Sequence, residues 1–188
     1  MASPVLLHAI AAAVGVTLAA PAAASVIVIG SNAARMCYEA ADSSLYPTPE
    51  IVGRCDEALQ DGSLDMHDIA ATHVNRGILR LRRGQIDRAI ADFDRAMQID
   101  PDQPEAYLNK GAALLRQGGE DATAARLFTI AIEHNTLRPA IAHFGRAVAN
   151  EGLGNVRAAY DDYRTASELD PRWQLPRAEL QRFRIVSR

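Results

Sequence analysis

Residues 74–77 read Val-Asn-Arg-Gly, and residues 108–111 read Leu-Asn-Lys-Gly, 34 positions further along the chain. Gly145 follows Gly111 at the same interval. A second series with this spacing consists of Gly84, Gly118 and Gly152. Self-similarity at a fixed period of roughly 20 to 50 residues is typical of a solenoid, in which each repeat packs on its neighbours. The glycine spacing therefore predicts three units with their first helices in a 34-residue register.

Each unit continues with apolar residues at helical spacing, which predicts a second helix with one apolar face. Glycine inside a helix lowers stability by about 1 kcal/mol relative to alanine, so Gly77 indicates close packing against the second helix near Ala89. Gly84 falls where the first helix ends and left-handed backbone is needed. The second-helix positions of the three units are Ala89, Phe93 and Ala96, then Ala124, Phe128 and Ala131, then Ala159, Tyr163 and Ala166.

These units resemble the tetratricopeptide repeat over about residues 68–171, with repeats at about 68–103, 104–137 and 138–171. The resemblance implies an all-α fold in which antiparallel helix pairs stack into a short right-handed superhelix. One extra residue between Gly118 and Ala124, and two between Gly152 and Ala159, depart from the repeat. We expect these insertions to change only the turns between helices, where loops tolerate changes in length.

Residues 25–67 precede the repeats and are expected to contain a helical hairpin over residues 33–60. Its turn contains two prolines, and Cys37 and Cys55 lie nine residues on either side of Tyr46 at its centre. Antiparallel helices would bring the two sulfur atoms to the same height. In an exported chain with two cysteines, this arrangement predicts a disulfide. The alternative is a pair of buried free thiols in a cytoplasmic protein.

Residues 172–188 follow the last repeat and predict a C-terminal cap helix. A repeat stack needs such a cap over its last apolar face. The apolar spacing includes Trp173 and Phe183. An alternative function for these two aromatic residues is to bind a partner.

The first 24 residues have the features of a secretory signal peptide. No charge occurs between Pro4 and Ala24, and small residues precede Ser25. This pattern predicts cleavage after Ala24 and a periplasmic or secreted protein. The alternative is an uncleaved membrane anchor, because residues 26–29 extend the apolar run. We expect contact with a membrane only in that case.

The remaining composition indicates a chain without catalytic chemistry. The formal net charge of −3 provides no basic surface for nucleic acid. His67 and His73 are six residues apart, and no Cys/His set has the spacing of zinc ligands. The glycine turns lack the strand and the Lys-Ser/Thr pair of a phosphate-binding loop. We therefore expect no catalytic residue, no metal and no cofactor.

The resemblance implies that a peptide or protein partner binds in a concave groove, lined by one face of each first helix. Asparagines and Arg146 suited to a terminal carboxylate are present, but Val74, Leu108 and Ala71 replace the lysines of such a site. Hydrophobic contact with a helix or an extended peptide is therefore favoured. The expected groove residues are Val74, Asn75, Ile78, Leu81, Leu108, Asn109, Ala112, Leu115, His143 and Arg146.

Two alternatives to groove binding remain open from the sequence. Asn75 and Asn109 could be structural residues that form hydrogen bonds between helices, with the C-terminal helix partly filling the groove. The protein could also act in assembly, as a homo-oligomer formed through the repeat ends or the N-terminal hairpin.

Overall fold

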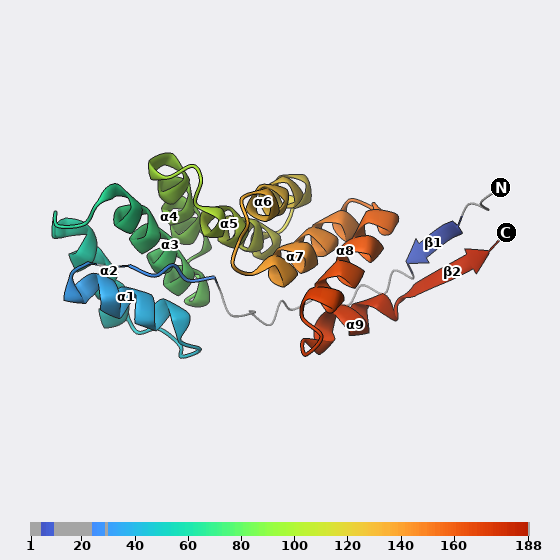
Figure 1. The fold of residues 1–188 in the computed structure, drawn as a ribbon, viewed down its shortest axis with the longest axis horizontal. Helices are drawn as coiled ribbons and strands as arrows, with labels where there is room; N and C mark the ends of the chain where they lie inside the picture. The colour runs from blue at the N-terminus through green and yellow to red at the C-terminus, as the bar shows by residue number, and fades with distance from the viewer. Residues whose placement is uncertain (1–4, 10–23, 29, 188) are drawn as a thin grey trace.

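The computed structural model describes residues 5–9, 24–28 and 30–187, and this part of the chain folds into stacked helical hairpins (Figure 1). The all-α prediction is confirmed, since helices account for every element of the stack. The helices are α1 (Asn32–Asp42), α2 (Pro49–Gln60), α3 (Met66–Arg82), α4 (Ile86–Ile99), α5 (Pro104–Gln117), α6 (Asp121–Glu133), α7 (Pro139–Gly152), α8 (Val156–Leu169) and α9 (Gln174–Leu180).

Local sequence signals begin several of these helices where they are observed. The side chains of Ser31, Thr48 and Asp65 accept hydrogen bonds from backbone N–H groups in the first turns of α1, α2 and α3. Such caps supply a partner for N–H groups that have none inside the helix. Pro104 and Pro139 occupy the first positions of α5 and α7, where their missing N–H costs no helical hydrogen bond.

The N-terminal hairpin forms as expected, and a Cys37–Cys55 disulfide joins α1 to α2 with a Cα–Cα distance of 5.0 Å. Both cysteines are fully buried. The guanidinium of Arg82 attaches this hairpin to α3, because it donates hydrogen bonds to the carbonyl oxygens of Ala41 and Ser43 at the end of α1. These carbonyls have no partner within their own helix.

Glycines allow the first helices to approach buried aromatic rings. A Cβ atom added at Gly77 would lie 2.4 Å from Cε1 of Phe93, and one at Gly111 would lie 3.0 Å from Cζ of Phe128. These two glycines therefore face the aromatic residue of their own unit. Gly145 differs, because a Cβ atom there would meet Phe128, which belongs to the preceding unit, at 2.3 Å.

The first and third units are related by 70 residues, so the predicted 34-residue register is wrong for the third unit. Gly84 and Gly154 share a φ of +75° at the ends of α3 and α7. Gly152, which was expected at that position, is the last residue of helix α7. The same shift of 70 residues places Ala147 at the position of Gly77 and Gly145 at that of Asn75.

The cause of the shift is the length of the connections. Residues 134–138 join α6 to α7, whereas residues 100–103 join α4 to α5. In the longer connection Asn135 takes a φ of +59°, and Thr136 N–H donates to the carbonyl of Ala131 to close the end of α6. The expected pair of extra residues between Gly152 and Ala159 therefore belongs mostly to this earlier connection.

The chain ends differently from the expected cap helix over residues 172–188. The cap helix α9 ends at Leu180, and β2 (Phe183–Ser187) pairs antiparallel with β1 (Val5–Ala9). Aromatic residues still cover the last repeat: the ring centroid of Trp173 lies 4.8 Å from that of Phe144, and that of Phe183 lies 6.0 Å from that of Tyr163.

The expected signal peptide, residues 1–24, lies outside the described residues except for β1 and Ala24. Among the helices that the structure does describe, none combines the length and the apolar character needed to cross a bilayer.

Replacing Gly77 by alanine should destabilise the fold by about 1–3 kcal/mol, because the new methyl group overlaps the buried ring of Phe93. Gly53 in α2 is the matched control, since a Cβ atom there meets nothing within 4 Å. Gly53→Ala should stabilise the chain by about 0.5–1 kcal/mol through helix propensity. Urea unfolding of both variants measures the difference, and equal stability of the two would contradict the close approach of α3 to α4.

Candidate functional site

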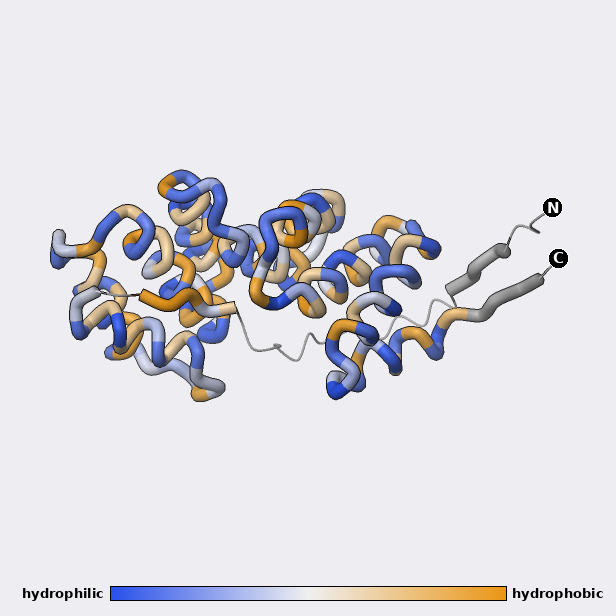
Figure 2. Tube along the Cα trace, viewed as in Figure 1, coloured by the Kyte–Doolittle hydropathy of each residue, from blue (hydrophilic) through white to orange (hydrophobic). Residues whose placement is uncertain are grey.

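An extended segment of the chain itself, residues 24–28, lies along the first helices of the repeats (Figure 1). It is bonded to α3 through Asn75 and to α5 through Asn109. Figure 2 shows it as a mostly hydrophobic strand beside more polar helices. We call the surface that holds it the α3–α5 site, formed by Val74, Asn75, Ile78, Leu108 and Asn109.

Asn75 pairs with both backbone groups of one residue. Val26 N–H donates to Oδ1 of Asn75 at 2.9 Å, and Nδ2 of Asn75 donates to the carbonyl of Val26 at 2.7 Å. This is the pattern by which a neighbouring strand would pair with an extended residue. Asn75 is fully buried, so these bonds supply the partners that its amide needs.

Asn109 repeats the contact one unit later. Its Nδ2 donates to the carbonyl of Ala24 at 3.1 Å and to that of Glu105, in its own helix, at 2.8 Å. The two asparagines thus bind backbone groups two residues apart on the same segment. A period of two is that of an extended strand whose alternate residues face one side.

The side chains of the segment follow the same alternation. Ala24, Val26 and Val28 are 2%, 9% and 5% exposed, whereas Ile27 between them is 62% exposed. Val26 and Val28 belong to one buried apolar cluster with Val74. Ala24 belongs to the next cluster, which contains Leu108. The α3–α5 site therefore reads the backbone through two amides and buries every second side chain.

The structure brings most of the predicted groove residues together around these two clusters. The five that form the α3–α5 site are buried. Three more are half-buried and pack against the same clusters: Leu81, Ala112 and Leu115. The C-terminal helix α9 packs against α8, so residues 24–28 occupy the position that this helix was expected to fill in part.

His143 and Arg146 do not join this site, which corrects their prediction as groove residues. Nδ1 of His143 lies 2.8 Å from Oδ1 of Asp162 in α8, and Arg146 donates two hydrogen bonds to the same carboxylate. The predicted alignment used Gly145 as the equivalent of Gly77. Since Gly145 instead matches Asn75, the third unit has no side-chain amide at the corresponding position.

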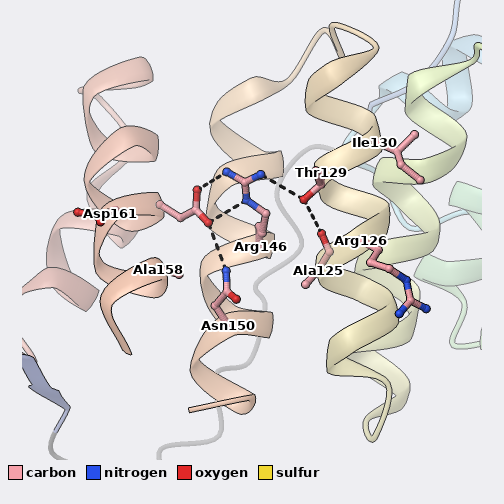
Figure 3. Close-up of a pocket in the computed structure, with 9 residues that line it drawn as sticks. Ala125, Arg126, Thr129, Ile130, Arg146, Asn150, Ala158 and Asp161 are labelled. Carbon is pink, nitrogen blue, oxygen red and sulfur yellow. Dashed lines mark hydrogen bonds and ion pairs between the residues drawn. The ribbon is translucent and has the colours of Figure 1, made fainter. Parts of the chain in front are cut away.

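Arg146 lies in a separate cavity of about 580 Å³, between α6 and α8 with α7 as its floor. Figure 3 shows the guanidinium between Asp162 and the hydroxyl of Thr129, to which it donates at 3.2 Å. The side-chain amide of Asn150 donates to Asp162 at 3.5 Å. We call this the α6–α8 cavity.

The first unit contains the same kind of network 70 residues earlier. Asp92 in α4 is 3% exposed and receives hydrogen bonds from Arg76 and Arg80, with Nδ1 of His73 at 3.1 Å. Arg76 also donates to Asp56 in α2 at 2.6 Å. Each network therefore ties a first helix to the second helix of its own unit and to the second helix of the preceding hairpin.

Electrostatics favour the ionised form of both carboxyl groups. Burial alone raises the pKa of Asp162, but hydrogen bonds from His143 and Arg146, with their charges, outweigh burial and lower it. Asp92 behaves alike: burial opposes ionisation, and the contacts with His73, Arg76 and Arg80 lower its pKa. Among the residues that the structure describes, no three His, Cys, Asp or Glu side chains gather as metal ligands.

Asp162→Asn should lower the free energy of unfolding by about 3 kcal/mol at pH 7, since it leaves Arg146 half-buried without its charged partner. The folded pKa lies below the unfolded value of about 3.9, so the stabilisation is present above that pH and is lost as the pH falls through the folded pKa. The gap between variant and wild type should therefore shrink at about pH 3. Urea unfolding at both pH values measures it.

Asp161→Asn is the matched control, because Asp161 pairs with Arg157 on the exposed face of the same helix. Its effect should stay within about 0.5 kcal/mol at either pH. Equal effects of the two substitutions would contradict the structural role of the Asp162 network.

Comparison with known proteins agrees with this architecture. The family models "TPR repeat" and "Tetratricopeptide repeat" match residues 77–118 and 119–172, together just over half of the chain. The DnaJ homolog subfamily C member 7 homolog of Schizosaccharomyces pombe is 32% identical over 116 residues, which cover 59% of this chain. The match covers 24% of that relative, so the chain spans about a quarter of its length.

Two solved structures show the same arrangement of helices. The first TPR of Spaghetti (RPAP3), bound to the HSP90 peptide SRMEEVD, has a TM-score of 0.56 and 26% identity, covering 60% of this chain and 87% of that one. YrrB, a TPR protein with an unusual peptide-binding site, has a TM-score of 0.59 and 18% identity, covering 67% and 62%. With three helix pairs in tandem and these matches, the chain belongs to the tetratricopeptide repeat family.

Proposed function

We propose that this chain is a non-enzymatic scaffold that binds an extended peptide segment of a partner protein at the α3–α5 site. The observation that carries the proposal is the pairing of Asn75 with both backbone groups of Val26. Every residue except proline has the same two groups, so the site suits any peptide that adopts an extended backbone. The peptide complexes of RPAP3 and the peptide-binding site of YrrB support this function.

The side chains of the site favour an apolar peptide. Val74, Ile78 and Leu108 are buried beside the two amides, and the first-helix positions expected to carry lysines in a carboxylate-binding relative hold Val74, Leu108 and Ala71. An acidic terminal peptide, such as the one bound to RPAP3, would find no cation here to pair with. The partner is therefore a peptide whose buried side chains are aliphatic.

Asn75→Ala and Asn109→Ala should each weaken peptide binding about tenfold, because each removes hydrogen bonds worth about 1–1.5 kcal/mol to the ligand backbone. Ligands are selected from a displayed peptide library on the full chain, and their affinities are measured by fluorescence anisotropy. Asn150→Ala in the α6–α8 cavity is the matched control and should leave the affinity unchanged. Peptides that lose affinity only with Asn150→Ala would place the binding site in that cavity and contradict the proposal.

We further propose that the scaffold is exported and is cleaved after Ala24. The uncharged leader and the small residues before Ser25 support this proposal. The Cys37–Cys55 disulfide supports it independently, because such bonds persist in oxidising compartments. A chain that begins at Ser25 retains Val26 and Val28 and loses only the Ala24 contact with Asn109.

Expression of the full sequence in a bacterium, followed by mass spectrometry of the periplasmic fraction, tests export. The expected species comprises residues 25–188 and gains the mass of one pair of hydrogen atoms on reduction. An intact Met1 chain with free thiols in the cytoplasm would contradict the proposal. An intact chain in the membrane fraction would favour the anchor instead.

A further inference from the structure

We propose that residues 24–28 are a built-in ligand of the α3–α5 site, and that a partner peptide binds by displacing them. The partner has small or β-branched aliphatic residues at alternate positions, as this segment has. This inference rests on the proposed function, because it identifies the ligand and the control of the same site. Three features of the segment support it: its bonds, its side chains and its attachment.

The bonds of the segment are those of a ligand. Its N–H and C=O groups at Val26, and its C=O group at Ala24, bond to side chains of the repeats and not to backbone. No helix or sheet of the stack is completed by these contacts. A peptide from another chain could make all three bonds with the same geometry.

The side chains define what a competing peptide must supply. Removal of the segment would expose the apolar surface that Ala24, Val26 and Val28 now cover, which is unfavourable in proportion to its area. A competitor that buries aliphatic groups at the same alternate positions avoids this cost. The position of Ile27 is free to vary, since its side chain is 62% exposed.

The attachment of the segment makes it a strong competitor. A Cβ atom added at Gly30 would lie 2.4 Å from Cδ2 of Leu64, so the backbone packs closely there, just before the Ser31 cap of α1. A ligand on so short a tether has an effective concentration on the order of 1 mM. An identical free peptide at about 10 μM would then occupy only about 1% of the sites.

Val26→Asp in the full chain should release the segment, because it places a carboxylate in the buried apolar cluster. Ile27→Asp is the matched control: it adds the same charge one residue later, where the side chain faces solvent. The probe is a fluorescein-labelled peptide with the sequence of residues 23–29 and two added C-terminal lysines. Fluorescence anisotropy measures its binding to each variant, after circular dichroism shows that helix content is retained.

Val26→Asp should bind the probe at least about tenfold more tightly than Ile27→Asp or wild type, if the free segment has an affinity of about 100 μM. Adding Asn75→Ala to Val26→Asp should abolish this gain, and a probe with aspartate at its Val26 position should not bind. Val26→Pro, which removes the N–H that donates to Asn75, provides a second releasing variant if the first fails to fold.

The outcomes separate this inference from the proposed function. Equal binding of the probe by the releasing variants and by Ile27→Asp would overturn the built-in ligand while leaving peptide binding intact. Binding by none of them would overturn both, since even the peptide that matches the segment would then have no affinity for the freed site.

Discussion

The buried side-chain amide of Asn75 is the constraint on which the functional surface depends. An amide without partners in this environment would cost about 1–3 kcal/mol, and the backbone groups of α3 around it are already used by the helix. An extended residue with its N–H and C=O on one edge satisfies both ends of the amide at once. Val26 provides these groups, and the alternation of a strand then directs Ala24 and Val28 to the same side, where Asn109 and the apolar clusters meet them.

The extent of this surface follows from the spacing of the repeats. The first two units present an asparagine 34 residues apart, but the longer α6–α7 connection moves the third unit so that Gly145 occupies that position. Backbone recognition through side-chain amides therefore ends at α5. The third unit uses its polar residues differently, since Arg146 and His143 neutralise Asp162 and hold α6, α7 and α8 together. Rigid stacking of this kind keeps the two asparagines at the separation that an extended peptide requires.

Much of this architecture could be predicted from sequence, because its signals are local. Glycine and aromatic spacing indicated the helix pairs, the symmetry of Cys37 and Cys55 about Tyr46 indicated the disulfide, and the position of Asn75 and Asn109 indicated a binding face. The placement of His143 failed because a shift of two residues turns a helical position by about 200°. The role of residues 24–28 was missed because their contacts span 49 and 85 residues, and because an apolar run beside a leader suggests export or a membrane. The alternation of Ala24, Val26 and Val28 was the one available signal.

Hydrogen exchange at individual backbone amides of the full chain, followed by nuclear magnetic resonance, tests the central claim most directly. The amide of Val26 donates to a buried side chain, whereas that of Ile27, one residue later, has no such partner among the described contacts. The account predicts that Val26 exchanges at least about tenfold more slowly than Ile27, and that Asn75→Ala removes the difference. Equal exchange rates at Val26 and Ile27 in the wild-type chain would contradict it.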